Sequence, residues 1–190
     1  MVQPLLRVET SPLVGDRRVQ ALQLLSDREK TRFAADPRPE TFLTGRMLLR
    51  ELAAGFTAQP LESITIAASC PDCDRPHGRP TIEGTELYVS LSHAGDRTVA
   101  ALLEGSAIGV DIEPRDASAE RLAAIREVAD GEDLRHWTRV EAVLKADGRG
   151  LRIDPREVVV WGDRATLDGR RYQLSEIDDP AYVISVAVAL

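Results

Sequence analysis

The segment Ile108-Gly-Val-Asp-Ile-Glu-Pro114 decides the fold, because it is the clearest strand in the chain. Two acidic residues alternate with its aliphatic residues. Side chains alternate between the two faces of a strand, so its three aliphatic side chains point into a core. Asp111 and Glu113 then lie together on the other face, about 7 Å apart at ~3.3 Å per residue. Two neighbouring carboxylates repel each other unless a cation compensates them. The segment therefore predicts either a cation site or an edge strand with a solvated acidic face.

A hard divalent ion such as Mg²⁺ suits such a pair, because it takes oxygen ligands from carboxylates, phosphates and water. The later stretch 132–146 has helical periodicity, and Trp137, Glu141 and Lys145 recur on one side of it at intervals of four residues. Glu141 and Lys145 are also in the order of an ordinary helix ion pair. The spacing alone leaves open whether Glu141 joins the two acids of the strand.

Two further segments carry chemically useful side chains. Ser90-Leu-Ser-His-Ala-Gly-Asp96 ends a strand in a turn, where Ser92 and His93 could hold phosphate oxygens; a simple turn is the alternative. Cys70-Pro-Asp-Cys73 with His77 offers three possible zinc ligands. The Pro, Gly and charged residues around these cysteines favour a plain loop instead.

The remaining periodicity predicts helices and strands in alternating groups. Expected helices cover residues 16–35, 40–54, 118–129 and 132–146, and expected strands cover 63–68, 87–91, 98–103, 108–112, 158–161, 165–167, 171–174 and 182–189. Helices followed by strands, twice over, indicate an α+β fold with two lobes rather than a parallel sheet. We expect an N-terminal lobe at 1–103 and a C-terminal lobe at 104–190 that carries the acidic motifs.

Composition limits the class of protein. The chain has 190 residues, a formal net charge of −7 and only two cysteines. An acidic balance disfavours nucleic-acid binding, which needs a basic face. No apolar run approaches the ~18 residues of a membrane span, and the first residues do not form a secretory signal. We therefore expect a cytoplasmic protein that contacts neither nucleic acid nor membrane.

Four motifs in order resemble the 4′-phosphopantetheinyl transferases, most closely those of the Sfp class. They are GRP at 78–80, SLSHAGD at 90–96, GVDIEP at 109–114 and WTRVEAVLKADGRGL at 137–151. The resemblance implies a monomer with two pseudo-symmetric α+β lobes. It also implies transfer of the phosphopantetheine arm of coenzyme A, the co-substrate, to a serine of an apo acyl or peptidyl carrier protein, with release of 3′,5′-ADP.

The resemblance further implies roles for particular residues. Asp111, Glu113 and Glu141 would hold Mg²⁺, with Mn²⁺ as an alternative. Glu141 would also be the base for the serine hydroxyl, and Lys145 would contact the phosphate and offset charge on the departing 3′,5′-ADP.

The same resemblance assigns the residues that would bind coenzyme A. Ser92 and His93 would hold its phosphates, and Arg79 and Pro80 would border its adenine. For the 3′-phosphate the candidates are Arg46 and Lys30.

One departure from the motif keeps a second interpretation open. Val140 stands where the family usually has lysine, which removes a cation expected near the site. A relative that binds coenzyme A without turnover is therefore an alternative to an active enzyme. A small interaction protein built on the Cys70, Cys73 and His77 loop is another.

Overall fold

The computed structural model describes residues 3–70, 73, 78–129 and 133–190, which form two compact units. Unit 1 comprises Met1–Val89 with Asp96–Gly105, and unit 2 comprises Ser90–Gly95 with Ser106–Leu190. The expected boundary was a single cut between residues 103 and 104, whereas here the segment 90–95 is grouped with unit 2. Helices and antiparallel strands occur in both units, which confirms the predicted α+β class.

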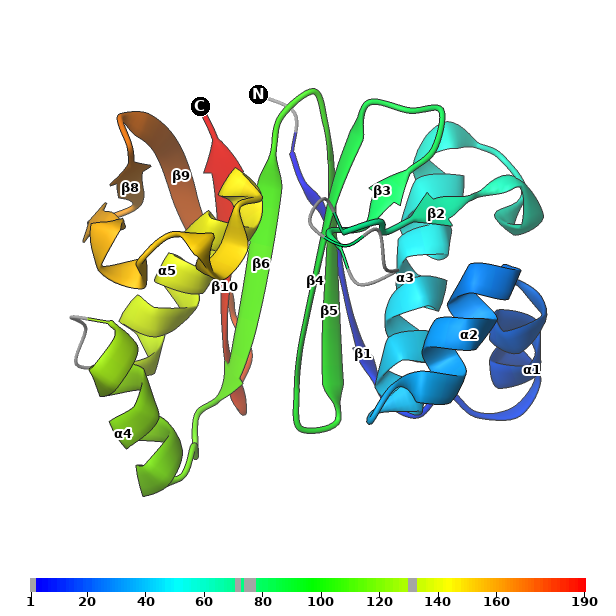
Figure 1. The fold of residues 1–190 in the computed structure, drawn as a ribbon, viewed down its shortest axis with the longest axis horizontal. Helices are drawn as coiled ribbons and strands as arrows, with labels where there is room; N and C mark the ends of the chain where they lie inside the picture. The colour runs from blue at the N-terminus through cyan, green and yellow to red at the C-terminus, as the bar shows by residue number, and fades with distance from the viewer. Residues whose placement is uncertain (1–2, 71–72, 74–77, 130–132) are drawn as a thin grey trace. The chain divides into compact units, whose positions relative to one another are not determined.

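Unit 1 has one long helix packed on a sheet (Figure 1). The strands are β1 (Leu5–Thr10), β2 (Ile66–Ala67), β3 (Thr81–Ile82), β4 (Leu87–Ala94) and β5 (Arg97–Glu104), and the helices are α1 (Gly15–Gln23), α2 (Asp27–Ala35) and α3 (Pro39–Thr57), followed by a 3₁₀ turn at Leu61–Ser63. The main sheet has the order β1-β5-β4, and β2 pairs with β3 in a separate ribbon. The packing of α3 against β1 and β5 builds the core of this unit. Sequence analysis had assigned neither β1 nor β3.

Two expected helix boundaries in unit 1 were wrong. The single helix predicted over 16–35 is two helices, because Ser26 starts a new one with a reciprocal capping box to Glu29. The next helix continues through Gly55, where we expected it to stop, and ends at Thr57. Ala58 then adopts a left-handed conformation with φ 54° and ends the helix.

Unit 2 has a five-stranded antiparallel sheet with a helix across one face (Figure 1). Its strands are β6 (Ile108–Pro114), β7 (Val159–Trp161), β8 (Arg164–Leu167), β9 (Arg170–Ile177) and β10 (Tyr182–Ala189), in the order β6-β10-β9-β8-β7. The helices are α4 (Ala119–Val128) and α5 (Leu134–Asp147), with 3₁₀ turns at Gly150–Arg152 and Pro155–Glu157. Helix α5 packs against β6 and β10.

A glycine allows α5 to lie directly on β6. A Cβ atom built on Gly109 would be 1.9 Å from the carbonyl oxygen of Ala142 and 2.5 Å from the amide nitrogen of Ala146. No other residue type leaves that space free. Val140, on the same helix, is buried in the apolar core of unit 2. The valine is therefore a packing residue, and the expectation that it removes a cation near the site stays a prediction.

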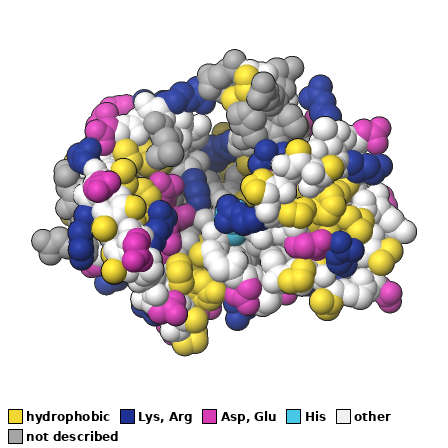
Figure 2. All heavy atoms as spheres, turned by 60° about the horizontal axis from the view of Figure 1, so that its bottom comes forward, with side chains coloured by type: hydrophobic (Ala, Val, Ile, Leu, Met, Phe, Trp, Pro, Cys, Tyr) yellow, Lys and Arg dark blue, Asp and Glu magenta, His cyan; other side chains and the backbone are white. Residues whose placement is uncertain are grey.

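The surface carries both signs of charge. On the face drawn in Figure 2, acidic and basic side chains are interspersed among apolar and neutral ones. Among the described helices, none combines the length and apolar character needed to cross a membrane.

Candidate functional site

Strand β6 carries two buried acids toward α5. Gly109, Asp111 and Glu113 alternate with the aliphatic residues of the strand, and the contact of Gly109 with α5 identifies their face as the helix-facing one. Asp111 is only 6% exposed and Glu113 only 8%. The alternative of a solvated acidic face is therefore wrong, and both carboxylates need partners inside the protein.

Lys145 of α5 is the partner of Asp111. Its Nζ atom lies 2.7 Å from Asp111 Oδ1 and donates to the Ser92 hydroxyl at 2.7 Å and to the Val110 carbonyl at 3.1 Å. Ser92 donates in turn to the same Asp111 oxygen at 2.7 Å. Three predicted site residues from three separate motifs thus form one hydrogen-bonded cluster.

The segment before the turn is held against β6 by a second serine. The buried hydroxyl of Ser90 accepts a hydrogen bond from the Val110 amide at 3.1 Å. This contact sets the position of Ser92 two residues later, because alternate side chains of a strand share a face. His93, on the opposite face, is exposed.

Glu113 is paired with a residue that sequence analysis missed. Arg121 of α4 donates a hydrogen bond from Nη2 to Glu113 Oε1. This bond raises the pKa of the Arg121 guanidinium, so the arginine stays charged. Arg121 lies outside every motif noted above, and no pattern in the chain marks it, since only the fold brings α4 to the end of β6.

Glu141 lies in the same electrostatic environment. Burial raises the pKa of its carboxyl, and the charges of Asp111 and Glu113 raise it further, while Lys145 and Arg121 act in the opposite direction. A raised pKa brings a carboxyl closer to the range in which it can exchange a proton at neutral pH.

The three acids do not form a ready metal cage. Among the described residues, no group of three His, Cys, Asp or Glu side chains lies close enough together to hold a metal ion. One oxygen nevertheless points to a missing partner: Asp111 Oδ2 is buried and accepts no hydrogen bond from the residues that the structure describes. A buried, unpartnered carboxylate oxygen is costly unless something binds it.

Arg46 of unit 1 also has unused hydrogen-bonding capacity. Its Nε atom lies 3.4 Å from Glu29 Oε1, while Arg50 binds both oxygens of Glu29, at 2.6 and 3.2 Å. Within the described part of the chain, Nε and Nη1 of Arg46 are buried without a hydrogen-bond partner. The guanidinium stacks over the Phe42 ring at 4.9 Å, which fixes its orientation. Burial lowers the pKa of Arg46, which favours an anionic partner for it.

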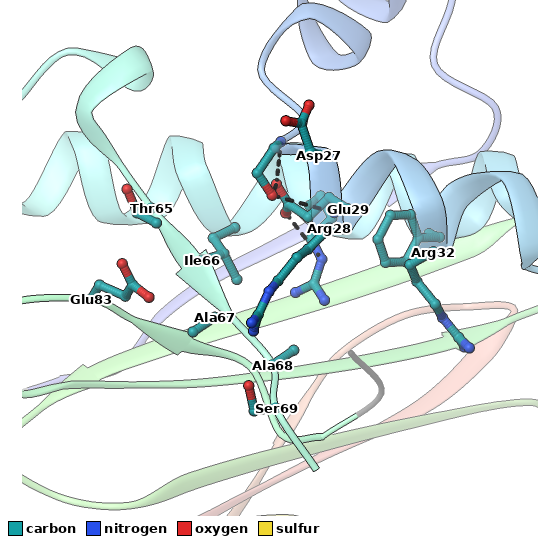
Figure 3. A pocket seen from close by; sticks show the side chains of 13 residues that line it. Asp27, Arg28, Glu29, Arg32, Thr65, Ile66, Ala67, Ala68, Ser69 and Glu83 are labelled. Atoms are coloured by element: carbon teal, nitrogen blue, oxygen red, sulfur yellow. Dashed lines mark hydrogen bonds and ion pairs between the residues drawn. The ribbon is translucent and has the colours of Figure 1, made fainter. Parts of the chain in front are cut away.

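Arg46 lines a cavity of about 460 Å³ between α2 and the β2 strand. The other charged lining residues are Asp27, Arg28, Glu29, Arg32 and Glu83. Figure 3 shows Arg28 extending from α2 toward Ala67 and Ala68. The sequence had singled out Arg46 here but not Arg28 or Arg32. Lys30, the other predicted phosphate ligand, is exposed and pairs with Asp27 at 3.3 Å.

Arg79 and Pro80 line a second cavity of unit 1, of about 390 Å³. The Arg79 guanidinium lies 5.9 Å from the ring centre of Tyr88, which is 41% exposed. A cation and an aromatic ring beside a proline form a surface on which a flat heterocycle can stack.

The cysteine loop is only partly described. Cys70 is half-buried, Cys73 is exposed, and neither forms a disulfide. His77, the third predicted zinc ligand, lies outside the described residues. At the base of the loop, Gly78 donates to the Ala68 carbonyl at 2.7 Å.

Comparison with known proteins adds no relative. No family model matches the sequence, and no curated protein is similar to it at a significant level.

Proposed function

We propose that this protein transfers the 4′-phosphopantetheine group of coenzyme A to a serine hydroxyl of an apo carrier protein. The observation that carries the proposal is the cluster of Ser92, Asp111 and Lys145. These residues come from three motifs that resemble the phosphopantetheinyl transferases, and a chance resemblance gives no reason for them to meet. Glu141 lies in the electrostatic environment of the same cluster.

The acids are chemically suited to a divalent metal ion. Oxygen donors are the ligands that Mg²⁺ and Mn²⁺ prefer, and the unpartnered Oδ2 of Asp111 is a free donor. We infer that Asp111, Glu113 and Glu141 would hold the ion. When bound, it would neutralise charge on the pyrophosphate oxygens of coenzyme A.

The reaction is a displacement at phosphorus. The serine oxygen of the carrier protein forms a bond to the phosphorus of the phosphopantetheine group. The bond from that phosphorus to the bridging pyrophosphate oxygen breaks, and 3′,5′-ADP leaves with the electron pair. The serine proton must be accepted by a base, and Glu141 is our candidate because burial and neighbouring acids raise its pKa.

Lys145 contributes the fixed positive charge. Its ammonium is held by three acceptors, so it is oriented before the substrate binds. A positioned cation stabilises charge that develops on the leaving group. Ser92 accepts from Lys145 and donates to Asp111, so it keeps this ammonium in place. To bind a phosphate oxygen, as the resemblance implies, Ser92 would have to turn its single hydroxyl proton away from Asp111.

Unit 1 supplies two candidate surfaces for the nucleotide part of coenzyme A. The unsatisfied guanidinium of Arg46 favours a phosphate in the cavity beside α2. Arg79, Pro80 and Tyr88 offer a stacking surface for adenine. Each surface is proposed from its own unit, and His93 remains a candidate phosphate ligand from the resemblance alone.

The decisive experiment mixes the protein with coenzyme A, Mg²⁺ and a panel of apo acyl and peptidyl carrier proteins, then determines the product masses. We expect one carrier or more to gain the mass of a phosphopantetheine group. A control carrier whose acceptor serine is alanine should gain nothing.

Two other outcomes have distinct meanings. Thermal protection by coenzyme A without any modified carrier would favour a binding protein that lacks turnover. Neither protection nor modification, together with stoichiometric zinc in the purified protein, would favour the cysteine-loop alternative.

A further inference from the structure

Arg121 faces the whole acidic cluster of unit 2 rather than a single acid. It bonds Glu113 directly, and the charges of Asp111 and Glu141 also act on its guanidinium. Its side chain is 47% exposed, whereas that of Glu113 is 10% exposed. The ion pair therefore joins a fixed, buried acid to a base that reaches water.

The cluster has fewer basic side chains than acidic ones, even with both Lys145 and Arg121 counted. Lys145 neutralises Asp111, and Arg121 neutralises Glu113. Glu141 is the third acid, and no described residue donates a hydrogen bond to Asp111 Oδ2. A cluster with one more acid than base attracts an additional cation.

We propose that Arg121 is a resident counter-ion that competes with the divalent metal ion for Glu113. This inference rests on the metal site of the proposed function. An oxygen that accepts from the guanidinium is less available to a metal ion, and two cations at the same acid repel each other. Arg121 is the partner that yields, because it can swing into water, whereas Lys145 is held by three acceptors.

The test measures Mn²⁺ binding to the full chain without coenzyme A, from the paramagnetic resonance signal of free Mn²⁺. Arg121→Gln removes the competitor, and we expect it to bind Mn²⁺ about two- to fivefold more tightly, as expected for loss of one partly exposed ion pair. Arg126→Gln removes the same charge from an exposed position on the same helix and should leave the affinity unchanged. Arg121→Lys, which keeps the charge without the planar fork, should fall between wild type and Arg121→Gln.

A second readout separates competition from a merely structural role. Without metal, Arg121→Gln should unfold at a lower temperature than Arg126→Gln, because Glu113 then lacks a partner. Saturating Mn²⁺ should reduce the difference in unfolding temperature between the two variants, since the ion then binds Glu113 in place of the lost arginine.

Each contrary outcome has its own consequence. If wild type binds Mn²⁺ and Arg121→Gln binds it equally or more weakly, Arg121 is not a competitor, and the proposed function stands. If wild type binds no Mn²⁺ at all, this inference and the metal site of the proposed function both fail.

Discussion

The two units bury charged clusters of opposite balance. In unit 1, two arginines, Arg46 and Arg50, share the single carboxylate of Glu29. In unit 2, two bases share three carboxylates. Each cluster also leaves buried atoms of its majority charge without a hydrogen bond from the described residues: Nε and Nη1 of Arg46 in unit 1 and Oδ2 of Asp111 in unit 2. The difference supports our proposal of an anion site in unit 1 and a cation site in unit 2.

The largest expected effect comes from removing the central acid of unit 2. Asp111→Asn keeps the shape of the side chain but removes the charge that binds Lys145, and we expect carrier-protein modification to fall at least about 100-fold. Product mass at fixed time measures the loss. Asp116→Asn, an exposed change in the same unit, is the matched control. Normal turnover by the Asp111 variant would show that the reaction does not depend on the acidic cluster.

A pair of glycine substitutions contrasts the packing of the two units. Gly109→Ala forces α5 away from β6, and we expect the unfolding midpoint to fall by about 3–10 °C, the cost of overpacking a core. Gly55→Ala in α3 meets open space and should raise the midpoint slightly, since alanine favours helix. Calorimetry of both variants checks the signs. Equal unfolding midpoints for the two variants would mean that the close approach of α5 to β6 does not contribute to stability.

The proposed anion site of unit 1 is tested through Arg46. Arg46→Gln removes a charge-assisted donor, and we expect the KM for coenzyme A to rise about tenfold while kcat changes little. Arg38→Gln, an exposed change in the same unit, should alter neither constant. A fall in kcat with an unchanged KM would assign Arg46 to another step.

A smaller, pH-dependent effect is expected at the end of α5. The Asp147 side chain has no solvent-exposed surface and accepts from Arg149, Arg170 and Tyr172. Its bond to Arg149 holds the pKa of its carboxyl below the usual value. A depressed pKa contributes stability above the unfolded-state value near 3.8 that is lost as pH falls through the folded-state value. Asp147→Asn should therefore lower the unfolding midpoint by about 5 °C at pH 7. Thermal unfolding measured at a series of pH values checks this: the difference in unfolding midpoint between wild type and Asp147→Asn should shrink steadily below pH 4. A difference that does not depend on pH would contradict this account.

The smallest effect is expected in the cysteine loop. Cys73→Ser changes an exposed side chain outside both charged clusters, so activity and unfolding midpoint should match those of wild type. Metal analysis of both proteins is the check. Loss of folding or of bound zinc in the variant would show that the loop is structural.

Several features of the fold follow from local pattern. The alternation in β6 correctly predicted which side chains share a face, because a strand has a strict period of two. Helical periodicity likewise placed Glu141 and Lys145 on one side of α5. The capping box at Ser26 was also legible in the sequence, as Ser-x-x-Glu, although the long periodic run around it concealed the break.

Other features depend on residues that are distant in the sequence. The burial of Val140 in the core of unit 2 was not evident from the sequence, because its neighbours there come from distant segments. The role of Arg121 could not be identified from the sequence. Its partner Glu113 lies on β6, and no motif describes the turn that leads from β6 to α4, the helix that carries Arg121. Strand β3 has only two residues, too few for a clear pattern, and is defined by its pairing with β2. Strand β1 has six residues and was missed for a different reason: it is identified by its pairing with β5, a strand far away in the sequence.

By itself, the sequence determined which side chains each helix and strand offers, since backbone geometry repeats over a few residues. Only the tertiary structure decided which of these side chains became partners. Ion pairing depends on distances between segments far apart in the chain, and here the missing Cβ of Gly109 sets the key distance by letting α5 lie directly on β6.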